Sequence, residues 1–256
     1  MKKSVVLTVK GRVLGGKIPN ICVPLVSSSL PGLLAEAKAA AQLQPDFLEW
    51  RVDYFEAVED VKQVLAAFAA LREIITDYPL IITCRDYAEG GFRPLDSNVR
   101  FDILRSLVLE AKPDFIDLEY RIGFKQLQPL ILAARQNGIH VILSTHNFKM
   151  TPTIDEMVTT LTKMQAAGCD LVKMAVMPNS KEDVLNLLAA TLRFTEKYAH
   201  IPCITMAMSE LGTISRIVGF YFGSAMTFAA GLKPSAPGQL PFPLLKTLLQ
   251  NEFFVL

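Results

Sequence analysis

The sequence has few of the residues and motifs that mark several classes of protein. Four cysteines occur among 256 residues, scattered at Cys22, Cys84, Cys169 and Cys203, with no CxxC pair. They predict buried thiols in a reducing cytosol and not a disulfide framework or a zinc site. Only three histidines occur, without HxH or HExxH. No metal site is therefore expected, and a metal-dependent hydrolase is a weak alternative.

The sequence also lacks an excess of charge of one sign. Its 26 basic and 25 acidic side chains give a net charge of +1. Nucleic acids and anionic membranes select basic proteins, so neither is expected as a partner. No apolar run approaches the roughly 20 residues of a membrane span, and residues 1–17 do not resemble a secretory signal. A soluble, cytoplasmic protein is expected.

What the sequence does contain is an alternation of strand and helix patterns. Apolar residues recur with helical spacing in five segments, at 31–43, 60–75, 124–138, 154–168 and 181–198. Eight β-rich runs are spaced among and around them, at 21–26, 46–53, 80–85, 115–120, 141–146, 171–177, 203–208 and 225–230. Residues 5–16 alternate around Lys10-Gly11 and predict an N-terminal hairpin.

This alternation predicts a parallel sheet with helices outside it. An open, doubly wound sheet is the competing fold, but no GxGxxG follows the first strand and no GxxxxGK[ST] occurs. Hydrophobic residues make up 51% of the chain, enough for a large core, and no linker divides it. We therefore expect one α/β domain over residues 1–256, a (β/α)₈ barrel.

Polar side chains share one face on several of the predicted strands. Because side chains alternate along a strand and the apolar face must meet the helices, these residues are expected inside the barrel. Most stand late in their strands, near the mouth where active sites of such barrels form. They are Glu49, Arg51, Asp53, Thr83, Arg85, Asp117, Glu119, Ser144, His146 and Lys173. A structural ion-pair network is the alternative reading, although buried charges rarely stabilise a protein better than apolar packing.

Lys173 lies in an otherwise apolar run, DLVKMAVMP. A solvent-facing lysine is the simplest reading. Inside a barrel, burial beside Met174, Met177 and other apolar groups is expected to favour the neutral amine, which condenses with a ketone to a Schiff base. His146 is the natural base for removing the adjacent acidified proton. Glu89, in the loop after the third strand, is placed to orient the imidazole. This chemistry requires no cofactor.

Seven motifs now carry a family resemblance. They are EWRVD (49–53), CRDYAEGG (84–91), IDLE (116–119), STHNFKMTP (144–152), VKMAVMP (172–178), ITMAMSELGTISR (204–216) and SAPGQL (235–240). In this order they resemble the motifs of type I 3-dehydroquinate dehydratase, from about residue 20 to 241. The resemblance implies a (β/α)₈ barrel, usually a homodimer. It also implies conversion of 3-dehydroquinate to 3-dehydroshikimate and water in the shikimate pathway, by syn elimination through an imine.

The resemblance also implies roles for individual residues. Lys173 matches the imine-forming lysine, His146 the general acid and base, and Glu89 the partner of the histidine. Arg216 matches the arginine that pairs with the substrate carboxylate. Glu49, Arg51 and Arg85 match residues that bind hydroxyl groups and form the polar floor. Ser235 and Gln239 match the loop that closes over the substrate, and Asp117 is expected to lie behind the residues that contact it. Met206, Met208, Phe148 and Phe228 are expected to wall the pocket.

Three departures and two alternatives accompany the resemblance. Pro24 stands where some members of the family have a polar residue. Asn147 follows His146 where the family often has aspartate, and Ser209 stands where glycine or alanine is common. A class I aldolase would share the buried lysine but would not need the SAPGQ loop or Arg216. A non-catalytic barrel that binds a small acid would bind without a covalent bond to Lys173.

Overall fold

The computed structural model describes residues 5–250. Its centre is an eight-stranded sheet in which all neighbouring strands are parallel, in the order β10-β3-β4-β5-β6-β7-β8-β9. The strands are β3 (Asn20–Leu25), β4 (Phe47–Arg51), β5 (Leu80–Thr83), β6 (Phe115–Glu119), β7 (His140–Asn147), β8 (Leu171–Val176), β9 (Cys203–Ala207) and β10 (Met226–Phe228). Each corresponds to one of the predicted runs.

The sheet closes on itself between its first and last members. Met226 of β10 pairs with Asn20 of β3, and on the other side Ser224 bridges to Cys203 at the start of β9. The Ala225 N–H completes this closure by donating to the Cys203 carbonyl over 2.7 Å. A closed ring excludes the open doubly wound sheet and confirms the (β/α)₈ barrel.

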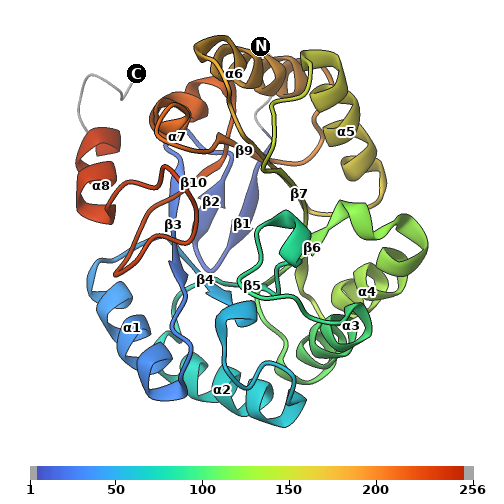
Figure 1. The fold of residues 1–256 in the computed structure, drawn as a ribbon, viewed down its shortest axis with the longest axis vertical. Coiled ribbons are helices and arrows are strands. Elements are labelled where there is room, and N and C mark those ends of the chain that lie inside the picture. Colours follow the sequence, from blue (N-terminus) through green and yellow to red (C-terminus); the bar gives the residue numbers. More distant parts are fainter. Residues whose placement is uncertain (1–4, 251–256) are drawn as a thin grey trace.

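Helices form a ring around the strands (Figure 1). They are α1 (Leu30–Gln42), α2 (Val61–Ile74), α3 (Ser97–Ser106), α4 (Phe124–Gln136), α5 (Ile154–Ala166), α6 (Lys181–Lys197), α7 (Thr213–Val218) and α8 (Phe242–Gln250). Side-chain caps fix several starts: α5 and α6 begin with capping boxes at Thr153 and Ser180. The five predicted helices are confirmed, whereas α3, α7 and α8 were not predicted. No helix within 5–250 combines the length and apolar character needed to span a membrane.

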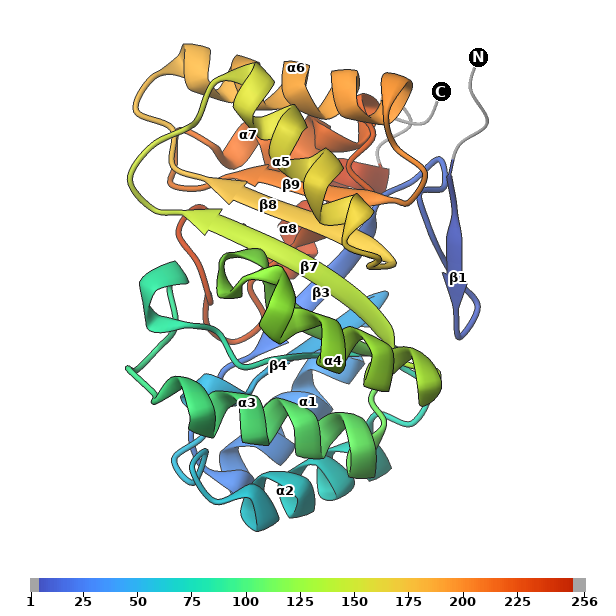
Figure 2. The same cartoon turned by 90° about the vertical axis from the view of Figure 1, so that its right-hand side faces the viewer.

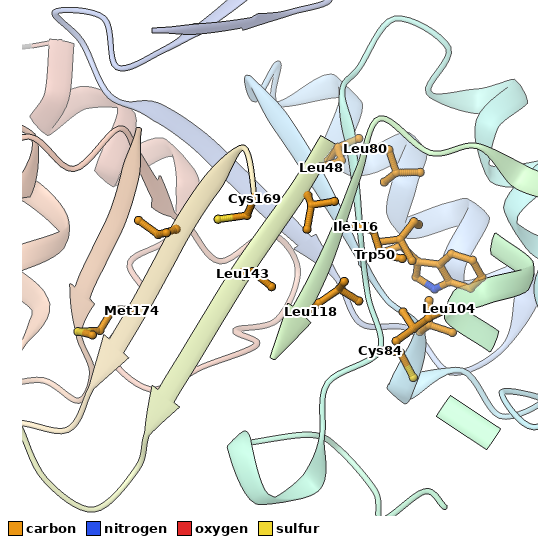
Figure 3. Close-up of a cluster of buried hydrophobic side chains, with 14 of the residues drawn as sticks. Leu48, Trp50, Leu80, Cys84, Leu104, Ile116, Leu118, Leu143, Cys169 and Met174 are labelled. Carbon is orange, nitrogen blue, oxygen red and sulfur yellow. The ribbon is translucent and has the colours of Figure 1, made fainter. Parts of the chain in front are cut away.

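The outer face of the sheet packs on the helices through a continuous apolar layer (Figure 3). Leu48, Trp50 and Ile116 belong to this layer and have no exposed surface. All four cysteines are free and buried, as predicted. Burial of this layer supplies the main driving force for placing the opposite strand faces inside the barrel.

The N-terminal hairpin covers one end of the barrel. Strands β1 (Leu7–Val9) and β2 (Arg12–Leu14) pair antiparallel, joined by Lys10 and Gly11, both at positive φ as a two-residue turn of this kind requires. Figure 2 shows the hairpin beyond the ends at which the parallel strands begin. Val9 and Leu14 join the apolar cluster inside the barrel. The opposite end, where the strands finish, remains available for a site.

Candidate active site

A cavity lies at the end of the barrel where the strands finish. It is lined by all nine residues assigned to catalysis or substrate binding from the sequence, namely Glu49, Arg51, Arg85, Glu89, His146, Lys173, Arg216, Ser235 and Gln239. The proposed wall residues Met206, Met208, Phe148 and Phe228 line it as well. Polar groups from different strands therefore converge on one small volume, as the alternation of side chains predicted.

Lys173 sits inside the barrel and is only 5% exposed. Its Nζ lies 3.1 Å from Asp117 Oδ2 and 3.6 Å from Glu49 Oε1. The ring of Phe228 presents its face to the amine, with the centroid 4.4 Å from Nζ. Two carboxylates and an aromatic face favour a cation at this nitrogen, and an iminium is such a cation.

One expectation about Lys173 is wrong. The neighbouring Met174 was expected beside the amine, but it belongs to the outer apolar layer because side chains alternate along β8 (Figure 3). The nearest partners of the amine are charged and not apolar.

Asp117 lies beneath the cavity and connects Lys173 to the barrel wall. Its carboxylate accepts hydrogen bonds from Arg85 Nη2 at 2.8 Å and from Ser144 Oγ at 2.5 Å. Burial alone would raise the pKa of Asp117, but the Arg85 and Lys173 cations overcome this and hold the pKa well below its usual range. Asp117 is thus a fixed anion under the amine.

His146 and Glu89 form a hydrogen-bonded pair at the cavity wall. Glu89 Oε2 lies 3.0 Å from His146 Nδ1 and also accepts from the His146 backbone N–H at 2.9 Å. Burial, together with the Arg85 and Lys173 cations, lowers the pKa of His146 well below its ordinary value. The neutral ring can donate from Nδ1 to the carboxylate, which leaves Nε2 as a proton acceptor.

Burial raises the pKa of Glu89 to about 7, against the opposing effect of Arg85. At neutral pH the pair therefore has a proton that either partner can hold. A protonated Glu89 would donate to Nδ1 and leave the proton of the imidazole on Nε2. The same pair is thus equipped to accept and to return a proton.

Arg216 is a buried cation without an acidic partner. Its side chain comes from α7 and is 2% exposed, yet no carboxylate within residues 5–250 forms an ion pair with it. Its Nη2 donates to the Pro237 carbonyl at 3.0 Å, and its buried Nε has no hydrogen-bond partner. Burial lowers the pKa of Arg216 to about 10, so the group stays charged at neutral pH. An uncompensated guanidinium in a cavity attracts an anion.

Residues 235–239 lie beside Arg216 and border the cavity. Gln239 and Ser235 hold each other through two hydrogen bonds, Ser235 N–H to Gln239 Oε1 at 2.8 Å and Gln239 Nε2 to Ser235 Oγ at 3.0 Å. Gly238 has φ +76°, and a Cβ there would lie 2.1 Å from the Ser209 carbonyl oxygen. The segment packs tightly against the turn that precedes α7.

Arg51 and the loop after β5 are held together by Asp53. Arg51 donates to both carboxylate oxygens of Asp53, from Nε at 2.9 Å and Nη2 at 2.7 Å. Asp53 is fully buried in a 3₁₀ turn after β4 and also accepts from the Arg85 and Phe92 backbone N–H groups. Strand alternation predicted its inward direction but not these loop contacts.

Two of the departures from the family pattern lie where strands end, since Asn147 is the last residue of β7 and Ser209 lies in the turn after β9. Asn147 Oδ1 accepts from the backbone N–H groups of Lys149 and Met150, as a carboxylate would at the same position. Ser209 has φ +59°, in the left-handed region that favours glycine.

Sequence reasoning missed two buried charged residues, Glu36 of α1 and Arg100 of α3, and Arg100 is the one that reaches the site. It contacts Glu119, which in turn contacts Arg85. Its helix was not predicted, because its apolar spacing is weak and a π-helical segment, Leu107–Ala111, interrupts it. The Asp96 cap, which accepts from Asn98 and Val99, was the available signal for a helix here.

Comparison with known proteins gives a consistent result. The family model of type I 3-dehydroquinase matches residues 21–253. The 3-dehydroquinate dehydratase of Bacillus licheniformis is 45% identical over 97% of both chains, and that of Salmonella typhimurium is 44% identical over 95% of this chain and 96% of the other. A crystal structure of the Clostridium difficile type I enzyme with covalently modified comenic acid superposes with a TM-score of 0.92, at 38% identity and 96% coverage of each chain. This chain belongs to the type I 3-dehydroquinase family.

Proposed function

We propose that this chain dehydrates 3-dehydroquinate to 3-dehydroshikimate in the shikimate pathway, with Lys173 forming a Schiff base with the substrate ketone. The observation that carries this proposal is the enclosed Lys173 amine in one cavity with the His146–Glu89 pair and with Arg216. An aldolase would need the lysine alone, whereas the unpaired Arg216 fits a substrate that carries a carboxylate.

Lys173 and His146 divide the reaction between them. The lone pair of the neutral amine adds to the carbonyl carbon, and loss of water gives an iminium that Asp117 and Glu49 stabilise. His146 Nε2 then removes a proton from the adjacent carbon, and the electron pair of that C–H bond moves towards nitrogen to give an enamine. The enamine expels the β-hydroxyl group, which takes the proton from His146 and leaves as water. Hydrolysis of the conjugated iminium restores the amine and releases the enone.

The remaining residues bind and orient the substrate. Arg216 pairs with its carboxylate, and Nε is a donor still unused for this task. Glu49, Arg51 and Arg85 contact its hydroxyl groups and form the polar floor, with Asp117 fixing Arg85 from behind. Ser235 and Gln239 close over the substrate, and Arg216 links this segment to the bound anion because it also donates to Pro237.

The test is an assay with 3-dehydroquinate that follows the absorbance of the enone, combined with borohydride reduction and peptide mapping. The wild-type chain should turn over, and reduction should trap the adduct on the peptide that contains Lys173. Lys173→Ala should abolish both signals, while Lys149→Ala, a change at an exposed lysine after β7, should leave them intact. Turnover by folded Lys173→Ala would refute the imine. Binding without trapping in the wild type would favour the non-catalytic barrel.

We also propose a single domain that works as a homodimer in the cytoplasm. Support comes from the absence of a linker in the sequence and from the family resemblance. One cooperative unfolding transition and a mass of twice 28.3 kDa in light scattering are expected. Two separate transitions would contradict the first point, and a monomer at micromolar concentration would contradict the second.

A further inference from the structure

Arg100 is a buried arginine that does not line the substrate cavity. It reaches from α3 to the end of β5 and is 2% exposed. Its Nε and Nη2 each donate to the Cys84 carbonyl at 3.1 Å, and its Nη1 donates to Asp86 Oδ2 at 2.9 Å. The residue between these two contacts is Arg85. Arg100 therefore holds the backbone before a cavity arginine and the side chain of the residue after it.

Glu119 is the second link between Arg100 and the cavity. One of its oxygens accepts from Arg100 Nη2 at 2.5 Å, and the other accepts from Arg85 Nη1 at 3.0 Å. Glu119 has no exposed surface, so neither pair is screened by solvent. The two guanidinium groups stand on opposite sides of one buried carboxylate.

From Arg85 the contacts continue to the reacting nitrogen. Arg85 Nη2 donates to Asp117 Oδ2 at 2.8 Å, and the same oxygen accepts from Lys173 Nζ at 3.1 Å. The contacts thus run from Arg100 through Glu119, Arg85 and Asp117 to Lys173, with alternating charge at every step. A second branch leads to the acid–base pair, since Asp86 caps the short 3₁₀ helix Tyr87–Glu89.

The charges of these residues explain why Arg100, the one farthest from the cavity, affects Lys173. Arg85 serves two buried carboxylates, Asp117 and Glu119. Without Arg100, Glu119 would lose its other cation and would draw Arg85 towards itself, away from Asp117. Asp117 would then hold the Lys173 Nζ more closely, away from the position from which it attacks a carbonyl.

We propose that Arg100 is a positioning residue for imine chemistry, acting through Glu119 on the Arg85–Asp117 pair under Lys173. The inference rests on the proposed role of Lys173. A positioning role differs from a purely structural one in two predicted effects. Removal of Arg100 should slow the covalent step more than it weakens substrate binding, and the decrease in rate should depend on the presence of Glu119.

The test compares Arg100→Gln, Glu119→Gln and the double variant in the absorbance assay and in single-turnover trapping by borohydride. Arg100→Gln should lower kcat and the trapping rate by about 10- to 100-fold, as misplaced catalytic groups do, with KM changed less than about 3-fold. In the double variant the uncompensated carboxylate is gone, so its kcat should exceed that of Arg100→Gln alone. Arg100→Lys, which keeps the charge but not the planar fork, should be intermediate.

Arg72 provides a matched control at the other end of the barrel. It is also a helix arginine that holds a carbonyl and a carboxylate, Tyr78 O at 3.0 Å and Asp114 Oδ2 at 2.7 Å. Arg72→Gln should change thermal stability but not kcat. The inference would be overturned if folded Arg100→Gln or Arg100→Lys had the kcat of the wild type. It would also be overturned if the effects of the two single substitutions on kcat were simply additive in the double variant. An inactive wild type would instead refute the proposed function.

Discussion

The two ends of the barrel interior are built from the same strands but from different residue types. At one end stand Phe47, Ile81, Phe115, Ile142 and Leu171, all without exposed surface. Two residues further along each strand, on the same inward face, stand Glu49, Thr83, Asp117, Ser144 and Lys173. A step of two residues therefore takes each strand from an apolar core to a charged floor.

The difference between the two ends indicates that one contributes mainly to stability and the other mainly to chemistry. The apolar end is sealed by Val9 and Leu14 of the hairpin and is filled mainly by hydrophobic side chains, and the buried Asn20 at the start of β3 donates to the Val13 carbonyl of the hairpin at 2.8 Å. The charged end removes several ions from water, which costs free energy that ion pairing only partly returns. Substitutions at the charged end should therefore lower activity more than stability, and substitutions at the apolar end should lower stability more than activity.

The sharpest test of this separation is His146→Ala. Loss of the general acid and base should lower kcat by about 10²–10⁴-fold, while borohydride still traps some adduct on Lys173. The melting temperature should fall little, because the ring borders the cavity and Glu89 keeps its hydrogen bond from the His146 backbone N–H.

His200→Ala, a change at an exposed histidine, is the control and should leave both quantities unchanged. Near-normal turnover by His146→Ala would remove the histidine from the mechanism. A large loss of stability with little loss of rate would break the comparison.

The complementary test is Phe115→Ala at the apolar end. Phe115 is fully buried and meets Phe47 edge to face at 5.8 Å. Its removal leaves a cavity and should lower the free energy of unfolding by about 3–5 kcal/mol, measured by urea denaturation. At a temperature where the variant remains folded, kcat should stay close to that of the wild type. Phe124→Ala, at an exposed position, should cost less than about 0.5 kcal/mol.

Much of this arrangement was predictable because it depends on local patterns. The alternation along β4 and β8 predicted the inward direction of Glu49 and Lys173 without knowledge of their partners. Helices with regular apolar spacing, such as α6, were predicted to within a residue or two of their ends. The residues at the cavity followed from the same periodicity and from the ordered motifs.

The remainder depends on contacts between distant parts of the chain. That Asp117 lies against both Arg85 and Lys173 is set by the stagger of three strands, which local sequence does not encode. Arg100 escaped notice because nothing in its own helix indicates that it reaches Glu119. The position of residues 235–239 over the cavity likewise came only from the family resemblance.

A smaller effect, on stability, is expected at the charged end when the pH is changed. Glu89 has a folded pKa of about 7 against an ordinary value of 4.5. Between these values the carboxyl has released its proton in the unfolded chain but retains it in the folded chain, so the contribution of Glu89 to stability falls as pH rises through this window and is constant above it. Glu89→Gln abolishes that loss.

The free energy of unfolding of Glu89→Gln should be compared with that of the wild type at pH 5 and at pH 8. The value for the variant minus that for the wild type should increase by on the order of 2 kcal/mol from pH 5 to pH 8. Urea denaturation at the two pH values measures it. The same variant should turn over more slowly, because an amide cannot exchange the proton with His146. If the variant and the wild type differ in stability by the same amount at both pH values, burial does not raise the pKa of Glu89.

The smallest effect is expected at Ser209, which joins the charged end to the segment above it. Its φ of +59° strains a residue with a side chain, and Ser209→Gly should raise the free energy of unfolding by about 0.5–1 kcal/mol. The Ser209 carbonyl packs on Gly238, so Gly238→Ala should push residues 235–239 away and raise KM. If Ser209→Gly also raises KM, the strained turn helps to hold residues 235–239 over the cavity. Backbone strain would then contribute to substrate binding alongside the charged side chains. If stability rises and KM does not change, the strain has no part in binding.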